Sequence, residues 1–131
     1  MKIAVIGLGY VGLPLAVLLA KKYPVSGFDI KKERTAQLKK GEDITREVDA
    51  TALNEVLVSN VPDEKGLFIT SDAEGIKDCN FYIVTVPTPV DKNNRPDLTA
   101  LYKASEAVGK VLKKGDICLL YTSDAADEGL G

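Results

Sequence analysis

Three glycines and one aspartate near the N-terminus have the types and spacing of a nucleotide-binding site. Gly7, Gly9 and Gly12 form the pattern Gly-x-Gly-x-x-Gly, and Asp29 follows seventeen residues after the last of them. In such a pattern the first glycine permits a tight turn, the second lets the backbone approach a pyrophosphate, and the third lets a helix pack closely on a strand. A carboxylate at the position of Asp29 accepts hydrogen bonds from the hydroxyls of an adenosine ribose. The set predicts a dinucleotide site.

A strand, a turn and a helix must follow one another for these residues to act together. Ile3 to Ile6 is a short apolar run that ends at a glycine, which is typical of a buried parallel strand. Apolar residues then recur at helical spacing from Leu13 to Ala20, and a second apolar run, Val25 to Phe28, ends at Asp29. Glycines that merely turn the chain are the simpler alternative, which this strand, helix and acid context disfavours. The phosphates would lie at the N-terminus of the helix.

The acid also bears on which dinucleotide binds. A carboxylate at position 29 repels a 2′-phosphate, so NAD is favoured over NADP. Lys31, Lys32 and Arg34 argue mildly for NADP, although they fit equally well as the solvated first turn of a helix. Ala16 extends the pattern to GxGxxGxxxA, which FAD-binding folds also use, whereas an aspartate rather than a glutamate at position 29 favours NAD.

Three longer motifs carry a resemblance to a known family. IGLGYVGLPLA, then GFD, then FYIVTVPTP with PDL shortly after it, resemble the N-terminal domain of the UDP-glucose/GDP-mannose dehydrogenase family. The likeness is greatest to the branch that oxidises UDP-N-acetylhexosamines for surface polysaccharides, and it covers Met1 to about Ile117. It implies an α/β fold with a Rossmann-like, doubly wound parallel sheet that is incomplete at its C-terminus, with residues 1–117 as a partial NAD-binding domain.

The resemblance also implies which residues bind the cofactor. The family commonly places a basic residue at the position of Arg34, against the adenosine side of NAD. The buried strand from Phe81 to Val86 should lie beside the first strand, so the stiff loop Pro87-Thr88-Pro89 faces the cofactor. A rigid turn without a binding role is the alternative for that loop. The predicted cofactor-binding residues are Gly7, Leu8, Gly9, Tyr10, Val11, Gly12, Asp29, Arg34, Thr88 and Pro89.

We expect no catalytic residue and no metal ligand in this chain. The cysteine on which the family's chemistry depends lies well downstream of the matched region, so neither Cys79 nor Cys118 corresponds to it. Both are expected to be small buried thiols in or beside strands. The chain contains no histidine, and the two cysteines lack the spacing of a zinc site.

Length and charge narrow the class of protein. The 131 residues suffice for one domain, and a net charge of −2 with interspersed acids and bases gives no sign of a nucleic-acid or membrane-surface partner. No apolar run reaches membrane-spanning length, and the chain begins directly with a core strand, so we expect a cytoplasmic protein. Further elements are expected at residues 32–40 (helix), within 42–59 (short helix), 67–70 (strand), 72–77 (one helical turn capped by Ser71 or Asp72), 98–112 (helix capped by Asp97) and from 116 (strand).

The last fourteen residues depart from the family pattern. After GDI the family continues with an apolar strand and a motif close to Glu-Ser-Thr, whereas Cys118 to Glu128 reads CLLYTSDAADE. That string resembles one reading frame of a transposon adapter used in preparing sequencing libraries. We therefore expect residues 118–131 to be a non-native tail, although Cys118 to Leu120 can still complete a strand. A genuine, divergent C-terminus is the alternative.

The resemblance implies a parent enzyme that oxidises the C6 alcohol of a UDP-hexose or UDP-N-acetylhexosamine to the uronic acid with two NAD. Such enzymes are commonly homo-oligomers, and the residues that select the sugar lie outside this chain. We expect the 131 residues to bind NAD weakly and to be inactive alone. A stand-alone NAD-sensing module without catalysis is the second hypothesis, and an FAD-binding domain is the third. Fold alone does not choose between them.

Overall fold

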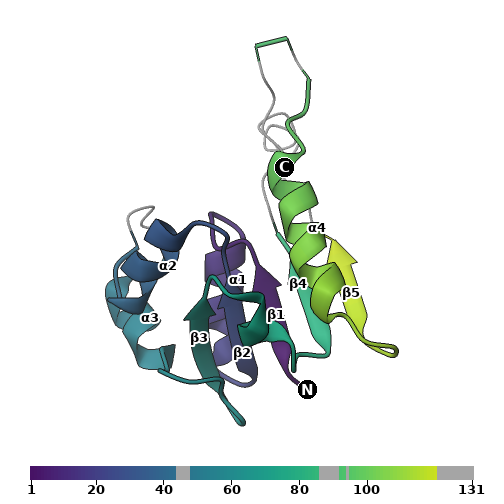
Figure 1. Ribbon diagram of the computed structural model, residues 1–131. Helices are drawn as coiled ribbons and strands as arrows, with labels where there is room; N and C mark the ends of the chain where they lie inside the picture. Colours follow the sequence, from purple (N-terminus) through teal and green to yellow (C-terminus); the bar gives the residue numbers. More distant parts are fainter. Residues whose placement is uncertain (44–47, 86–91, 94, 121–131) are drawn as a thin grey trace.

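The computed structural model describes residues 1–43, 48–85, 92–93 and 95–120 of the chain. Strands and helices alternate along the sequence, and every connection between neighbouring strands is a crossover (Figure 1). The elements in chain order are β1 (Ile3–Ile6), α1 (Gly12–Ala20), β2 (Pro24–Phe28), α2 (Lys32–Lys39), α3 (Ala50–Val56), β3 (Gly66–Thr70), the 3₁₀ turn η1 (Ala73–Ile76), β4 (Phe81–Val84), α4 (Thr99–Val111) and β5 (Ile117–Leu120).

The five strands form one parallel sheet in the order β3-β2-β1-β4-β5. Ile3 of β1 pairs with Val25 of β2 on one side and with Phe81 of β4 on the other. The chain therefore reverses its direction of travel across the sheet between β1 and β4, and ligands of doubly wound sheets bind at such a switch point. The predicted Rossmann-like α/β fold and the pairing of the first strand with FYIV are confirmed.

Alternate residues of β1 face two separate apolar cores. Ile3 and Val5 pack with α1, α2 and α3, whereas Ala4 and Ile6 pack with η1 and α4. This period of two is what a strand covered on both faces requires. In Figure 1, α2 and α3 accompany the β1–β3 half of the sheet, and α4 accompanies β4 and β5. β1 and β2 are buried along their whole length, which is why their sequences are mostly apolar without a polar alternation.

Several boundaries differ from the sequence-based expectation by one or two residues. β2 and β3 each begin one residue earlier than expected, at Pro24 and Gly66, because their register with neighbouring strands extends to those residues. Residue 86, where β4 was expected to end, lies outside the described part of the chain; the described strand ends at Val84. Asp97 accepts a hydrogen bond from the backbone N–H of Thr99 at 3.0 Å, so it caps α4 from one position before Leu98.

Tyr82 is fully buried in β4, and its hydroxyl donates to the backbone carbonyl of Ile76 at 3.0 Å. Burial raises the pKa of Tyr82 from 10.0 to about 12, because the phenolate loses hydration. The folded state thus retains the proton more tightly than the unfolded chain. The stability that this provides is complete below pH 10 and is lost as the pH rises from 10 through about 12.

We expect Tyr82→Phe to lessen this alkaline loss of stability and to cost about 1 kcal/mol at neutral pH, through the lost hydrogen bond. The free energy of unfolding in urea, measured from pH 7 to 12, checks both effects. Tyr10→Phe is the matched control, because Tyr10 is 68% exposed. If both variants keep the wild-type alkaline profile, Tyr82 does not cause the loss.

Candidate dinucleotide-binding site

The turn after β1 depends on Gly7. Its φ of 97° lies in the left-handed region, which side chains rarely adopt, so the sharp exit from the strand needs a glycine. The backbone N–H of Gly7 donates to the carbonyl of Phe28 at 2.7 Å. The turn is thereby attached to the end of β2, next to Asp29.

Gly12 and Gly9 differ in the space that a side chain would have at each position. A Cβ on Gly12 would overlap the carbonyl oxygen of Gly7 and the hydroxyl of Thr85, and would lie 2.9 Å from the carbonyl carbon of Gly7. The same atom on Gly9 would have no heavy atom within 4 Å. Gly12 is therefore needed for helix α1 to approach the strand. Gly9 faces open space, where a ligand's phosphates could approach the backbone.

Thr85, the residue that follows β4, secures the glycine turn from the other side of the switch point. Its buried hydroxyl lies 2.8 Å from the carbonyl oxygen of Gly7 and 3.2 Å from that of Ile6, as a shared donor. Its backbone N–H also donates to Ile6 at 2.8 Å. This role of Thr85 was not predicted from the sequence, because its partner lies 78 residues away and a threonine at the end of a buried strand is also typical of simple packing.

Asp29 connects the end of β2 to the glycine loop. Its Oδ2 accepts the backbone N–H of Leu8 at 3.0 Å, and its Oδ1 accepts that of Lys31 at 2.9 Å. A carboxylate has about four acceptor positions, so these two bonds leave capacity for two hydroxyls. The carboxylate is thus oriented by the backbone and still able to bind a diol such as a ribose.

Arg34, on α2, also forms a hydrogen bond with the glycine loop. Its Nε donates to the carbonyl of Leu8 at 2.8 Å, and its Nη1 pairs with Oδ1 of Asp43 at 2.9 Å. The Arg34 side chain is 11% exposed and that of Asp43 is fully buried. Nη2 of Arg34 is buried and has no hydrogen-bond partner within the described residues. An unused buried donor is costly, so Nη2 is a donor that a ligand could satisfy.

A pocket of about 260 Å³ lies beside this loop. One part of its wall is apolar and includes two alanines of α4, whose short side chains leave room for a flat group. Asp29 and Arg34 supply the polar part. The lining residues are Ile6, Gly7, Leu8, Gly9, Phe28, Asp29, Ile30, Lys31, Arg34, Ala100 and Ala104. An apolar slot beside an oriented carboxylate suits an adenosine group.

Of the residues predicted to bind a cofactor, Gly7, Leu8, Gly9, Asp29 and Arg34 meet in this pocket. Gly12 lies behind the loop at the helix–strand contact. The Tyr10 side chain is 68% exposed and, like that of Val11, does not line the pocket. Thr88 and Pro89 lie outside the described residues.

α1 begins at Gly12 with no acidic residue in its first turn. The positive end of the helix dipole is therefore not neutralised by a carboxylate of its own first turn and favours an anion beside the glycine loop.

The two cysteines differ in burial. Cys79 is buried, which raises its thiol pKa by desolvation. Cys118 is exposed, contrary to the expectation that both are buried. Within the described residues no cluster of potential metal ligands is found, and no helix is long and apolar enough to cross a membrane.

Known proteins are similar to this chain in sequence and in fold. UDP-N-acetyl-D-glucosamine 6-dehydrogenase of Pseudomonas aeruginosa is 53% identical over 119 residues, which are 91% of this chain and 26% of that protein. Protein CapL of Staphylococcus aureus is 46% identical and matches 92% of this chain and 26% of its own length. The solved UDP-D-ManNAc dehydrogenase of Pyrococcus horikoshii superposes with a TM-score of 0.79 at 35% identity, covering 93% of this chain and 28% of that one.

These relatives are several times longer, and this chain spans 26% of the length of the two curated ones. The model of the NAD binding domain of the UDP-glucose/GDP-mannose dehydrogenase family matches residues 1–123. The parallel sheet, the glycine turn and the acid at the end of β2 are the features that such a domain requires. The chain belongs to the UDP-glucose/GDP-mannose dehydrogenase family, through the match of residues 1–123 to its NAD binding domain.

Proposed function

We propose that this chain binds NAD in the pocket beside the glycine loop, as the cofactor-binding part of a UDP-sugar 6-dehydrogenase. The observation that carries the proposal is the Asp29 carboxylate, which is fixed by the N–H groups of Leu8 and Lys31 and still has free acceptor capacity. An isolated glycine pattern would support only a turn. Its combination with an oriented acid and an apolar slot supports a dinucleotide.

The adenosine ribose, the adenine and the pyrophosphate of NAD each have a matching feature in this chain. Asp29 would accept both hydroxyls of the adenosine ribose, and the apolar wall would hold the adenine. The pyrophosphate would lie over Gly9, at the N-terminus of α1. Nη2 of Arg34 would donate to the adenosine side. Tyr10, Val11, Thr88 and Pro89 complete the proposed set by resemblance to the family.

The chemistry that NAD supplies is oxidation of an alcohol carbon, and this chain's own residues bind and orient the cofactor for it. Asp29 and Arg34 would orient the adenosine end. Their own side chains are held in place by hydrogen bonds with the backbone N–H and carbonyl of Leu8. The main-chain turn at Gly7 is fixed by Phe28 and Thr85. The site is thus preorganised by hydrogen bonds within the chain, which lowers the entropic cost of ordering it on binding.

For the whole protein, we propose oxidation of the C6 alcohol of a UDP-hexose or UDP-N-acetylhexosamine to the uronic acid with two NAD. The support is the name and the 53% identity of the Pseudomonas aeruginosa relative, UDP-N-acetyl-D-glucosamine 6-dehydrogenase. A role in polysaccharide biosynthesis, a homo-oligomer, a cytoplasmic location, and the absence of nucleic-acid or membrane partners belong to the same proposal. The free thiols of Cys79 and Cys118 suit a reducing compartment.

Residues 1–131 alone are proposed to be inactive, since no residue within them is assigned a catalytic role. The non-native origin of residues 118–131 is part of this proposal. Sequencing the source DNA across the codon for Ile117 tests it, and a native reading frame for CLLYTSDAADE would contradict it. The second hypothesis, an NAD-sensing module without catalysis, has no observation in its favour beyond the fold.

The proposal is tested by titrating the purified chain with NAD, NADP and FAD in a calorimeter. We expect NAD to bind at least about tenfold more tightly than NADP, a difference of roughly 1.4 kcal/mol, because Asp29 repels a 2′-phosphate. We expect no oxidation of UDP-sugars by the chain alone. Equal affinity for NADP, or a yellow protein that retains FAD, would contradict the assignment. Turnover of a UDP-sugar would contradict the inactivity of residues 1–131.

A further inference from the structure

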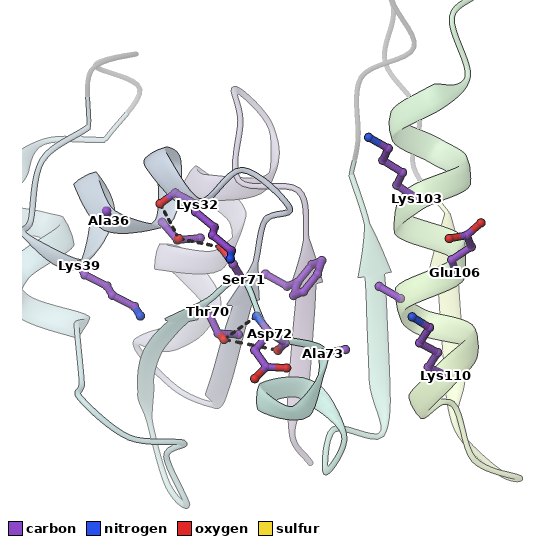
Figure 2. A pocket seen from close by; sticks show the side chains of 13 residues that line it. Lys32, Ala36, Lys39, Thr70, Ser71, Asp72, Ala73, Lys103, Glu106 and Lys110 are labelled. Atoms are coloured by element: carbon purple, nitrogen blue, oxygen red, sulfur yellow. Dashed lines mark hydrogen bonds between the residues drawn. The ribbon is translucent and has the colours of Figure 1, made fainter.

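A second, larger hollow of about 740 Å³ lies between α2, the end of β3 and α4. It exists because the crossover from β3 to β4 contains only the four-residue 3₁₀ turn η1 and no full helix. Figure 2 shows Lys32, Ala36 and Lys39 on one side, Lys103, Glu106 and Lys110 on the other, and Thr70 to Ala73 between them. Phe28 lines both this hollow and the dinucleotide pocket.

Four lysines line the hollow in two matched pairs. Lys32 and Lys39 lie seven residues apart on α2, and Lys103 and Lys110 lie seven residues apart on α4. Seven residues are about two helical turns, so each pair projects from one side of its helix. Among the described residues, none of these four lysines forms an ion pair.

The carboxylates of the lining do not balance these cations. Glu106 and Asp72 are its two acids, so the lining carries four positive and two negative charges, a net +2, in a chain whose total is −2. Oδ1 of Asp72 already accepts the backbone N–H of Glu74 at 3.0 Å. The hollow is therefore a local cationic concentration that attracts anions.

The floor of the hollow is polar, and hydrogen bonds hold its side chains in place. The hydroxyls of Thr35 and Ser71 lie 2.8 Å apart, joining α2 to the end of β3. The hydroxyl of Thr70 accepts the N–H of Asp72 at 3.0 Å. Thr35 and Thr70 are almost entirely buried. The hydroxyl of Thr35 also donates to the carbonyl of Lys32 at 3.0 Å, so an anion in the hollow would take its hydrogen bonds from the surrounding lysines and not from this floor.

We propose that this hollow binds the oligophosphate group of a small molecule, at a site separate from the dinucleotide pocket. Lysine ammonium groups bind phosphate as point charges, and two facing pairs suit an anion with several charges. The volume of about 740 Å³ is within the range of small-molecule sites and far below what a folded partner needs. Because Phe28 lines both pockets, the anion lies next to the adenosine end of the dinucleotide site.

Inorganic tripolyphosphate is the probe, titrated into the purified chain in a calorimeter at low ionic strength. We expect one site in the wild type and at least tenfold weaker binding in Lys103→Gln/Lys110→Gln. Lys21→Gln/Lys22→Gln removes the same charge from the end of α1, outside the hollow, and should change the affinity by less than twofold. These lysines are exposed, so both variants are expected to fold.

Equal loss of affinity in the two variants, or none in either, would overturn the proposal, because the anion would then respond to net charge or bind elsewhere. Displacement of tripolyphosphate by NAD would also overturn it, since the anion would lie at the glycine loop. Oligoglutamate that binds as tightly, with the same sensitivity to Lys103→Gln/Lys110→Gln, would assign the hollow to an acidic peptide instead. The NAD titration of the wild type is independent of all three outcomes.

Discussion

Replacing Gly12 by alanine is expected to lower the free energy of unfolding by at least about 3 kcal/mol, the upper range for overpacking a rigid contact. The added methyl group overlaps the carbonyl of Gly7 and the hydroxyl of Thr85. The obstruction is largely backbone, so no side-chain rotation relieves it. Urea unfolding followed by circular dichroism measures the loss, and NAD affinity should fall with it because the glycine loop moves.

Two other glycines provide matched controls. In Gly9→Ala the added methyl group would have no heavy atom within 4 Å. We therefore expect the free energy of unfolding to stay within about 0.5 kcal/mol of the wild type while NAD binding weakens. Gly109→Ala, within α4 and also in open space, should stabilise the chain by up to about 1 kcal/mol. A Gly12→Ala protein as stable as the wild type would show that α1 does not pack against the turn as described.

Replacing Asp29 by alanine is expected to weaken NAD binding about 100-fold, or about 2.7 kcal/mol, through loss of charge-assisted hydrogen bonds to the ribose. The change also removes the acceptor for the N–H of Leu8, so the loop loses one of its fixed contacts. The preference for NAD over NADP should diminish, because the charge that repels a 2′-phosphate is gone. Calorimetric titration with both cofactors measures the two effects.

Asp63→Ala is the control for the lost charge, since the Asp63 side chain is 92% exposed and its ion pair with Lys2 spans 3.6 Å. It should bind NAD like the wild type. Asp29→Asn removes the charge and keeps the amide oxygen as acceptor for the N–H of Leu8, while the exposed N–H of Lys31 loses its acceptor and bonds to water instead. We expect its stability to stay near wild type and its NAD affinity to fall. Unchanged NAD affinity in both Asp29 variants would refute the role of the carboxylate.

The local part of the site could be predicted from sequence because its signals are local. The strand, the glycine turn, the helix and Asp29 fall within the first 29 residues, and apolar periodicity predicts each element. The pairing of β1 with β4 followed from the rules for doubly wound sheets. Boundaries shifted by a residue or two, since register with neighbouring strands determines where a strand begins.

Long-range contacts could not be predicted in the same way. The bond from Thr85 to Gly7 spans 78 residues, and no pattern near Thr85 distinguishes it from a threonine that fills space. The buried pair of Arg34 and Asp43 was also not predicted, because no local pattern joins an acid beyond Gly41 to a basic residue of the preceding helix. The basic hollow depends on α2 and α4 lying on opposite sides of a short crossover, which composition does not reveal. The role of Thr88 and Pro89 stays a prediction.

The sequence separation of the contacts around the glycine loop bears on the order in which they can form during synthesis. The hydrogen bond between Leu8 and Asp29 joins residues 21 apart in the sequence, whereas the hydrogen bond between Thr85 and Gly7 joins residues 78 apart. Synthesis proceeds from the N-terminus, and contacts close in sequence can form first. The glycine loop and its acid can thus assemble while β4 is still unmade. Once Thr85 has been made, its hydroxyl can bind the carbonyl of Gly7, and the glycine turn is then held from both sides before α4 and β5 complete the pocket and the sheet.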